Sequence, residues 1–435
     1  MRASLAMAVG VLLAVVAGAC SSTQLPDIEQ SSPTTTSDEP APTTTVGPST
    51  PTSPATPPTL PVDDLDLPAR LATLGPAGEL LVRSADGSWE QWSEPDTLVS
   101  QFSWSPDGTQ LTWTELTADG SSLIVGDGQE RTELDTTHAP FYLLWTPAGD
   151  EVSHLGQAED QIALTVSSDG ASPVAVAEAS SLYYSWSPEG RLVTHEGGSD
   201  LNLIDAGEPE LVAQTSAAFQ APVWLDENRV VAVVDLERGD ALAIVDVDDK
   251  SVTPLFEIDG NITFTVSPDR TRLAYQIQAD AGVDDRPVSD VPAQTDEPDP
   301  DDTPDVLVLD LETTELTLAF VGQALWLDWS PDSTSLAALI SAPELTWRLW
   351  DENELTRTES VEISPVMLQN FVPFFDQYSQ SLTGWSPQSD QYAFAASLAG
   401  RTGVFVQDAS VGGDVSFLGP GVMVAWSQPA PTEPE

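Results

Sequence analysis

The sequence predicts an all-β protein built as an eight-bladed β-propeller of four-stranded antiparallel blades. Three observations lead to this prediction. A tryptophan followed by a tight turn recurs along the chain, its copies are separated by roughly one blade's length, and the two ends of the repeat array complement each other. A period of about 40 residues punctuated by turns is typical of propeller blades. The elements are taken below in chain order.

The first residues, 1–19, have the features of an export signal. Arg2 gives a positively charged start, Leu5–Val16 is an apolar run, and Ala17–Ala19 supplies small residues directly before Cys20. An apolar run this short does not span a hydrocarbon core of about 30 Å. We therefore expect this segment to be removed rather than retained as a membrane helix.

The surroundings of Cys20 resemble the lipobox of bacterial lipoproteins. In that family the cysteine is acylated on sulfur and becomes the mature N-terminus, although a leucine usually stands where this chain has Ala17. The resemblance implies lipid attachment at Cys20 and a lipid-anchored position on the extracytoplasmic face of the cell membrane. The alternative is an ordinary secretory signal followed by an incidental cysteine. Because Cys20 is the only cysteine, no internal disulfide can form.

Residues 20–67 are predicted to form a disordered stalk. Between Ser21 and Val62, 28 of 42 residues are Ser, Thr or Pro, so the segment lacks the apolar side chains needed to offset its ordering entropy. The same reasoning applies to the short tail, 429–435. The propeller is therefore expected to occupy residues 68–428.

The recurring phrase is clearest at Ser103–Gly108, which reads Ser-Trp-Ser-Pro-Asp-Gly. Proline presets the turn, aspartate bonds to backbone amides, and glycine tolerates left-handed geometry. Its tryptophan slot, filled once by valine, falls at residues 104, 145, 186, 224, 266, 329, 385 and 426. Strand-forming runs follow the turns, for example Leu111–Trp113, Ala241–Asp246 and Leu316–Phe320. With the tryptophan strand, each unit has four strands, and the indole is expected to pack between neighbouring blades.

The ends of the array predict how the ring closes. Arg70–Leu98 contains three strands that precede every tryptophan phrase, and the last tryptophan strand, Val422–Ser427, has no strands after it. Pairing these ends completes a blade and removes two free edges. The count is then eight blades, or seven if the irregular unit at Trp224 or Trp385 is not a blade.

The phrase is similar to the repeat of TolB-type and prolyl-oligopeptidase-type propellers, often called WD-repeat-like. The resemblance extends over residues 68–428 and implies architecture rather than activity, because one fold serves many functions. Peptidases of the second type carry an α/β-hydrolase domain with a Gly-x-Ser-x-Gly motif. This sequence has no such motif and no glycine-rich phosphate-binding loop.

Charge and histidine content narrow the function classes. The chain has 69 acidic and 14 basic residues, a net charge of −55 that repels nucleic acid. His138, His154 and His195 have no companions at metal-ligand spacing, so we expect surface histidines, no metal site and no cofactor. The acids of the turns, such as Asp107, Asp269 and Asp332, are expected to cap their turns. Asp246, Asp248 and Asp249 resemble the start of a calcium loop, but Lys250 stands where that loop has a glycine, so we expect no calcium site there.

Two insertions explain the long repeat spacings. The first, Ala279–Pro304, is acidic and is expected to be a solvated loop. The second, Ser360–Gln380, is apolar and contains Phe371, Phe374, Phe375 and Tyr378. Because large exposed apolar patches are rare, we expect it to fold over the propeller as a lid or plug. The alternative is an exposed partner-binding site.

These observations favour a monomeric, membrane-anchored, non-catalytic propeller that binds or organises a protein or glycan partner at the cell envelope. The alternative is an extracytoplasmic enzyme of propeller type, a glycan lyase or hydrolase, with carboxylates in the central funnel. Acidic and basic groups converging at one mouth of the channel would favour the enzyme.

Overall fold

The computed structural model describes residues 63, 65–118, 120–205, 208–215, 220–237, 239–278, 305–341, 343–351, 354–378, 380–410 and 412–428. The predicted export signal, Cys20, the acidic insertion, the tail and nearly all of the stalk lie outside the described residues. What was said of them stays a prediction.

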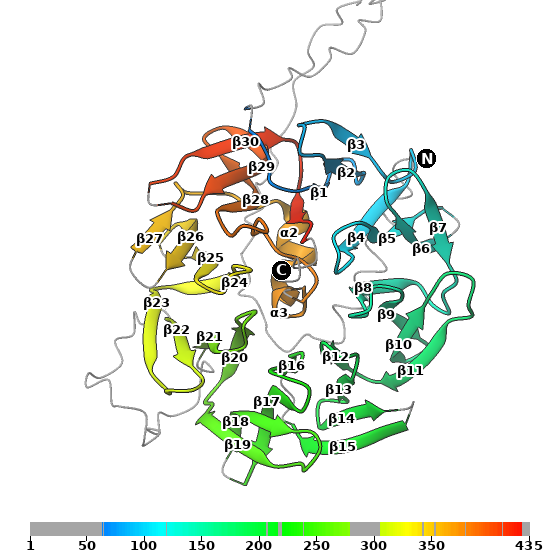
Figure 1. Cartoon of the computed structure of the whole chain (residues 1–435), viewed down its shortest axis with the longest axis vertical. Helices are drawn as coiled ribbons and strands as arrows, with labels where there is room; N and C mark the ends of the chain where they lie inside the picture. The colour runs from blue at the N-terminus through cyan, green and yellow to red at the C-terminus, as the bar shows by residue number, and fades with distance from the viewer. Residues whose placement is uncertain are drawn as a thin grey trace, which may run out of the picture. The chain divides into compact units, whose positions relative to one another are not determined.

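The described strands form eight antiparallel sheets arranged as blades around a common axis, which confirms the predicted eight-bladed β-propeller (Figure 1). Blade 1 contains β31 (Met423–Trp426), β1 (Leu71–Leu74), β2 (Leu80–Arg83) and β3 (Trp89–Gln91). Blade 2 contains β4 (Leu98–Trp104), β5 (Leu111–Leu116), β6 (Ser121–Gly126) and β7 (Arg131–Leu134). Blade 3 contains β8 (Pro140–Trp145), β9 (Val152–Ala158), β10 (Gln161–Ser167) and β11 (Val174–Ala179). Blade 4 contains β12 (Leu182–Trp186), β13 (Leu192–Glu196), β14 (Asp200–Asp205) and β15 (Glu208–Gln214).

The second half of the ring is built in the same way, and each blade is again given from its inner strand to its outer strand. Blade 5 contains β16 (Val223–Trp224), β17 (Arg229–Leu236), β18 (Gly239–Asp246) and β19 (Val252–Glu257). Blade 6 contains β20 (Asn261–Val266), β21 (Arg272–Gln278), β22 (Val306–Asp310) and β23 (Leu316–Phe320). Blade 7 contains β24 (Gln323–Trp329), β25 (Ser335–Ser341), β26 (Leu345–Asp351) and β27 (Glu354–Arg357). Blade 8 contains β28 (Gln391–Leu398), β29 (Arg401–Asp408) and β30 (Val415–Gly419).

The ring closes through blade 1, as the ends of the repeat array predict. β1 pairs with β31 in antiparallel register, with Leu71 opposite Trp426 and Leu74 opposite Met423. The hydroxyl of Thr73 also donates to the carbonyl of Met423 at 2.6 Å. The first and last strands of the propeller therefore share one sheet, in which β31 is the innermost strand and β1 is paired on both sides.

Blade 8 departs from the regular pattern at its inner strand, which is reduced to a single bridge between Trp385 and Tyr392. Hydrogen bonds from a neighbouring blade compensate for the missing ladder. The indole N–H of Trp385 donates to the carbonyl of Asp328 at 2.9 Å, and the Gly384 amide donates to the Asp328 carboxylate at 2.8 Å. The irregular Trp385 unit is thus a true blade.

The tryptophan slot holds adjacent blades together. The indole N–H of Trp145 donates to the carbonyl of Ser103 on the preceding inner strand at 3.2 Å, and Trp224 makes the equivalent bond to Ser185 at 3.0 Å. Each ring also buries a large apolar area between two sheets. The repeat therefore follows from the need to seal one blade against the next.

The turns that carry the full Ser-Pro-Asp phrase are fixed by their aspartates. In blade 2 the Asp107 carboxylate accepts from the Ser105 hydroxyl at 2.6 Å and from the Thr109 amide at 2.9 Å. Asp269 and Asp332 make the same contacts in blades 6 and 7. These bonds confirm the predicted turn-capping role.

The folded region begins earlier than the boundary expected at residue 68. Asp63 donates its amide to the carbonyl of Phe417 and accepts from the Phe417 amide, at 2.9 and 2.8 Å. Arg401 forms an ion pair with the Asp63 carboxylate at 3.2 Å. The composition of the sequence could not reveal that Asp63 belongs to the folded region, because its partners Arg401 and Phe417 lie more than 300 positions away.

Candidate functional site

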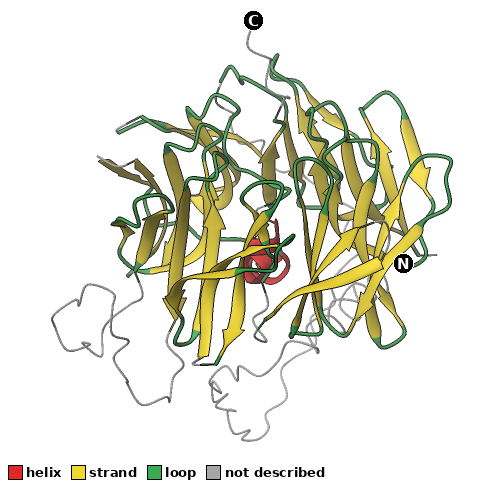
Figure 2. Ribbon diagram, turned by 60° about the horizontal axis from the view of Figure 1, so that its bottom comes forward, coloured by secondary structure: helices red, strands yellow, loops and turns green. Residues whose placement is uncertain are grey.

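The ring axis is occupied by the apolar insertion, which is helical rather than irregular. It forms α2 (Pro365–Asn370), the 3-10 helix η1 (Val372–Phe374) and α3 (Phe375–Tyr378). Ser364 caps α2 by accepting from the Met367 amide at 3.0 Å, and Pro365 occupies the first turn, where no amide donor is needed. Figures 1 and 2 show the helices inside the ring, surrounded by strands.

Aromatic side chains of the insertion pack on the inner strands. Phe371 is completely buried and lies 5.1 Å, centroid to centroid, from the ring of Tyr378. Tyr378 lies 5.5 Å from Tyr142 of β8, and Phe375 lies 5.9 Å from Trp326 of β24. Phe374 is half-buried at the edge of the same cluster. We call Phe371, Phe375 and Tyr378, with the helices that carry them, the axial plug.

The axial plug is also tied to the blades by polar contacts. The side-chain amide of Gln380 donates to the carbonyl of Tyr184 in β12 at 3.3 Å. The Tyr184 hydroxyl in turn donates to the carbonyl of Tyr142 at 3.2 Å. Burial raises the pKa of both Tyr184 and Tyr378, so both hydroxyls keep their protons at neutral pH.

Tyr142 has the least usual conformation in this cluster. Its φ is +61°, at a bulge between Phe141 and Leu144, and its amide donates to the side-chain carbonyl of Gln101. A left-handed tyrosine costs about 1–3 kcal/mol and persists only where its surroundings hold it. Among the described residues its buried hydroxyl has no hydrogen-bond partner, and burial followed by the nearby charge of Asp376 raises its pKa.

Two carboxylic acids near the axis have raised pKa values. Burial raises the pKa of Asp376 in α3 to about 7, and that of Asp328 in β24 also to about 7. In Asp328 the carboxylate accepts from the Gly384 amide and the Thr383 hydroxyl, at 2.8 and 3.1 Å. These bonds partly offset the effect of burial. These bonds give Asp328 a structural role, joining blades 7 and 8, and not that of a reactive acid.

Two small cavities lie among the described residues. One cavity of about 20 Å³ lies between Met367 of α2 and the rings of Trp347 and Tyr392, and another of about 10 Å³ lies beside His195 and Gln220. A cavity needs about 10–15 Å³ to hold one water molecule. Each can therefore hold at most one or two waters, not a substrate.

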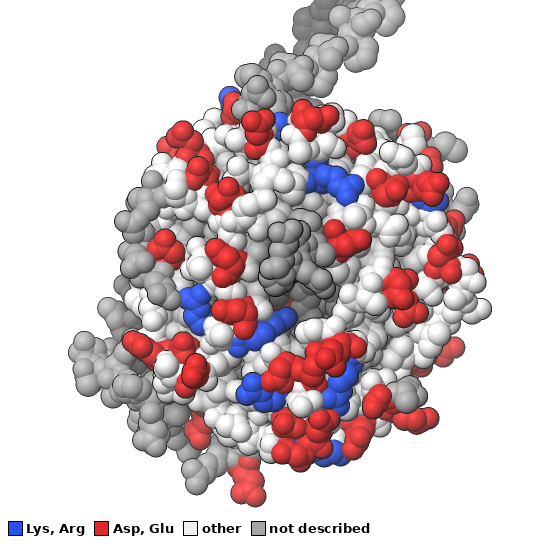
Figure 3. Space-filling view, in the orientation of Figure 1, with Lys and Arg blue, Asp and Glu red and all other residues white. Residues whose placement is uncertain are grey.

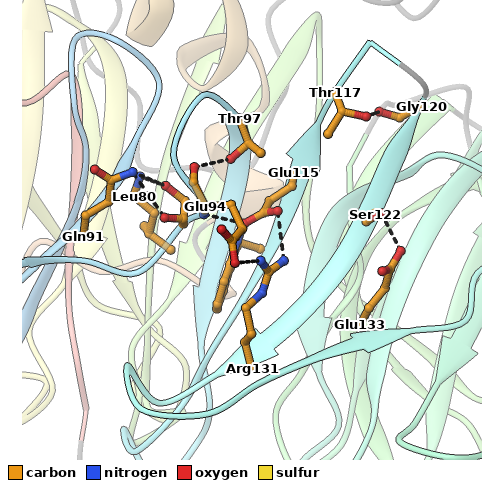
Figure 4. Close-up of polar contacts among 12 residues, drawn as sticks. Leu80, Gln91, Glu94, Thr97, Glu115, Thr117, Gly120, Ser122, Arg131 and Glu133 are labelled. Carbon is orange, nitrogen blue, oxygen red and sulfur yellow. Dashed lines mark hydrogen bonds and ion pairs between the residues drawn. The ribbon is translucent and has the colours of Figure 1, made fainter.

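An ionic network around the buried carboxylate of Glu115 lies between blades 1 and 2 (Figure 4). The Glu115 carboxylate accepts from the Trp113 indole at 2.9 Å, the Glu94 amide at 3.1 Å and Arg131 at 3.0 Å. Arg131 also pairs with the Glu94 carboxylate at 2.6 Å. These bonds fix the loop that carries Glu94 against blade 2.

Three arginines at or directly before the start of a blade's second strand contact the next blade. Arg70 donates to the carbonyl of Gly108 at 2.6 Å, and its guanidinium lies 5.2 Å from the Trp104 ring. Arg191 and Arg272 repeat this contact in blades 4 and 6. Figure 3 shows basic side chains interspersed among a larger number of acidic ones on this face. These cations stabilise contacts between blades and do not form a cluster for an anionic ligand.

The prediction of surface histidines was wrong for two of the three. His154 in β9 and His195 in β13 are buried, whereas His138 is half-exposed. β9 and β13 are the second strands of their blades, and the neighbouring blades cover both faces of such a strand. A histidine there is buried although the strand also contains polar residues. Burial lowers the pKa of His154 to about 4, and its Nε2 lies 3.1 Å from the Ser167 hydroxyl.

Within the described residues, no group of three or more His, Cys, Asp or Glu side chains could hold a metal ion. Asp246 caps its own turn, accepting from the amides of Asp248 and Asp249 at 3.0 Å. In the same described part of the chain, no helix is long and apolar enough to cross a membrane.

Sequence reasoning did not identify Asp328 or Asp376. A signal for Asp328 exists in the repeat: the residue before the tryptophan slot is uncharged in every other unit, for example Ser103, Ser185 and Ala425. A carboxylate in this inward position implies a dedicated partner. For Asp376 no comparable signal exists, because the insertion has no counterpart in the other repeats.

No protein-family model matches the chain, and no curated protein sequence matches it. Among solved structures, a eukaryotic initiation factor is 10% identical with a TM-score of 0.51, over 84% of this chain and 100% of that one. An oligogalacturonate lyase in complex with manganese is 12% identical with a TM-score of 0.49, over 82% of this chain and 98% of that one. TolB from Acinetobacter baumannii is 13% identical with a TM-score of 0.37, over 73% of this chain and 82% of that one. At this identity, likeness extends to the propeller fold alone.

Proposed function

We propose that this protein is a non-catalytic binding or scaffold module for an envelope protein or glycan. In this proposal it acts as a monomer, held at the extracytoplasmic face of the cell membrane by a lipid on Cys20. The observation that carries the proposal is the axial plug. The funnel, in which a propeller enzyme would be expected to hold its substrate, is filled by the chain's own Phe371, Phe375 and Tyr378. Binding is then left to the outer surfaces of the blades.

The charged groups described above support the same proposal. Asp328, Glu115 and the three arginines each bond to protein groups that fix neighbouring blades. Catalysis by paired carboxylates needs two acids that face one open space large enough for a sugar. The cavities of about 20 and 10 Å³ do not provide that space.

Membrane attachment is tested with Cys20→Ser in the full chain. Two acyl chains anchor a protein stably, whereas a single signal gives marginal binding. We expect the wild type in the membrane fraction after a high-salt wash and the variant in the soluble exported fraction. A variant that stays with washed membranes would show that Cys20 is not the anchor.

The binding role is tested by capture from detergent-solubilised envelope with the purified full chain, using its heat-unfolded form as the control. We expect capture of a defined protein or glycan by the folded chain only. The enzyme alternative is tested on the same preparation by following new reducing ends or unsaturated products from envelope glycans. Turnover that survives purification to homogeneity would replace the binding role with a catalytic one.

A further inference from the structure

The outer strand of blade 6 is the least protected edge of the described propeller. β23 is the last strand of its sheet and lies at the rim of the ring (Figure 1). An edge strand presents unpaired N–H and C=O groups to solvent, and proteins usually guard such edges with charges, proline or a covering segment. The eight outer strands can therefore be compared by how each is guarded.

Six of the described outer strands contain a charged residue or a proline: β3, β7, β11, β15, β19 and β27. The seventh, β30, is covered because Phe417 exchanges two hydrogen bonds with Asp63. In the part of the chain that the structure describes, β23 is the outer strand with none of these protections. Its sequence, Leu-Thr-Leu-Ala-Phe, has high strand propensity and no charge.

The side chains along β23 are apolar and exposed. Leu316 and Leu318 are 37% and 51% exposed, and Val321 directly after the strand is 55% exposed. Leu316 lies opposite Leu309 and Leu318 opposite Leu307 on β22, so both leucines project from one face of the sheet. We call Leu316, Leu318 and Val321 the rim strip. Such a strip, beside a strand edge that no other described strand covers, matches the requirements for binding an extended peptide.

The charges beside the rim strip identify the kind of partner. Glu312 and Glu315, in the turn that leads into β23, are exposed. A second copy of this chain, with a net charge of −55, would be repelled. A segment with basic ends would be attracted.

We infer that β23 binds an extended segment of an envelope protein by strand addition. That segment has apolar residues at alternate positions, which contact the rim strip, and basic residues that pair with Glu312 and Glu315. This inference rests on the proposed binding function and specifies where and what the protein binds.

The test uses the full chain and a labelled synthetic peptide, Lys-Lys-Leu-Thr-Leu-Thr-Val-Lys-Lys, in fluorescence anisotropy titrations. A peptide of equal charge with proline in place of both threonines controls for attraction to the acidic surface. We expect the first peptide to bind at least about tenfold more tightly, because proline removes the amide donors that pair with β23. Equal binding of the two peptides would overturn strand addition.

Variants then locate the site. Leu316→Thr with Leu318→Thr should weaken binding about tenfold, and Glu312→Gln with Glu315→Gln should weaken it several-fold and reduce its dependence on salt. The matched control is Leu211→Thr, another exposed leucine on an outer strand, β15, that carries Glu208 and Glu210. Equal losses for the control, or none for the Leu316 and Leu318 variant, would place binding elsewhere.

Two further outcomes separate this inference from the proposed function. If the wild type captures nothing from solubilised envelope, the binding function itself fails. If the wild type and the Leu316→Thr, Leu318→Thr variant capture the same partner equally, only the docking site at β23 is wrong. Concentration-dependent dimers in sedimentation that this variant abolishes would identify a second copy as the occupant and contradict the basic segment.

Discussion

At the scale of single residues, Asp328 shows how one buried carboxyl compensates for a missing strand. Its carboxylate accepts from Gly384 and Thr383, beside the single bridge that blade 8 has in place of a regular inner strand, and its carbonyl accepts the usual slot bond from Trp385. Burial raises its pKa from 3.8 to about 7 although the bonds from Gly384 and Thr383 lower it. Ionised Asp328 is therefore tolerated at a cost in folding free energy.

This raised pKa predicts a pH dependence. In the unfolded chain Asp328 loses its proton near pH 4, and in the folded protein it does so near pH 7. Its contribution to stability is therefore complete below about pH 4 and is lost as the pH rises to about 7. Asp328→Asn removes this slope, so the variant should gain up to roughly 4 kcal/mol relative to the wild type between pH 4 and pH 8. Urea unfolding at several pH values measures the difference, and parallel curves would contradict the assignment.

The turn residues and the buried acids differ in how well the sequence predicts them. Asp107 could be assigned from its local pattern, since its partners Ser105 and Thr109 lie two residues away. Burial of His154 and the partners of Asp328 could not, because they depend on blades distant in sequence. Local hydrogen bonds are therefore predictable from one sequence, and contacts between blades are predictable only where the repeat itself encodes them.

At the scale of elements, the axial plug is the part that departs most from the repeat. Its apolar composition predicted either packing or an exposed docking site, and its burial pattern is that of a packed core, with Met367, Phe371, Phe375 and Tyr378 almost inaccessible. Its helices could not be predicted from periodicity, because α2 and α3 are only six and four residues long.

Changing Phe371, Phe374 and Phe375 together to serine measures what the axial plug contributes. Loss of large buried side chains costs about 3–5 kcal/mol each where the site cannot collapse, and less for the half-buried Phe374. We expect the free energy of unfolding to fall by several kcal/mol. Val366→Ser with Leu368→Ser, at exposed positions of α2, is the matched control and should change little. An unchanged melting temperature in the triple variant would mean that the plug does not stabilise the ring.

At the scale of the whole molecule, blade number and closure could both be predicted, because seven of the eight repeats carry a tryptophan in the slot that packs between blades. The pairing of Leu71 with Trp426 joins the ends of a propeller whose neighbouring blades otherwise follow one another in sequence. The described boundary at Asp63 and the edge at β23 required the structure, since both depend on what covers a strand.

Closure is tested by deleting β31. Truncation after Gly419 leaves blade 1 with three strands and exposes the inner edge of β1, so we expect aggregation or loss of cooperative unfolding. Removing 279–304, which the sequence predicts to be a solvated loop, should cost little, because shortening such a loop changes the closure entropy only slightly. Differential scanning calorimetry compares the two deletions. Similar melting behaviour would contradict the closed ring.

The filled axis is the central claim, and native-state hydrogen exchange of the full-length protein tests it most directly. The amide of Phe371 donates to the carbonyl of Met367 at 3.1 Å, and the amide of Leu382, directly after the insertion, donates to the carbonyl of Tyr378 at 2.9 Å. If the axial plug is part of the core, these amides should exchange nearly as slowly as those of inner strands such as β24. Exchange as fast as at the exposed turn glycine Gly170 would mean that the plug opens readily, and the funnel would again be available to a substrate.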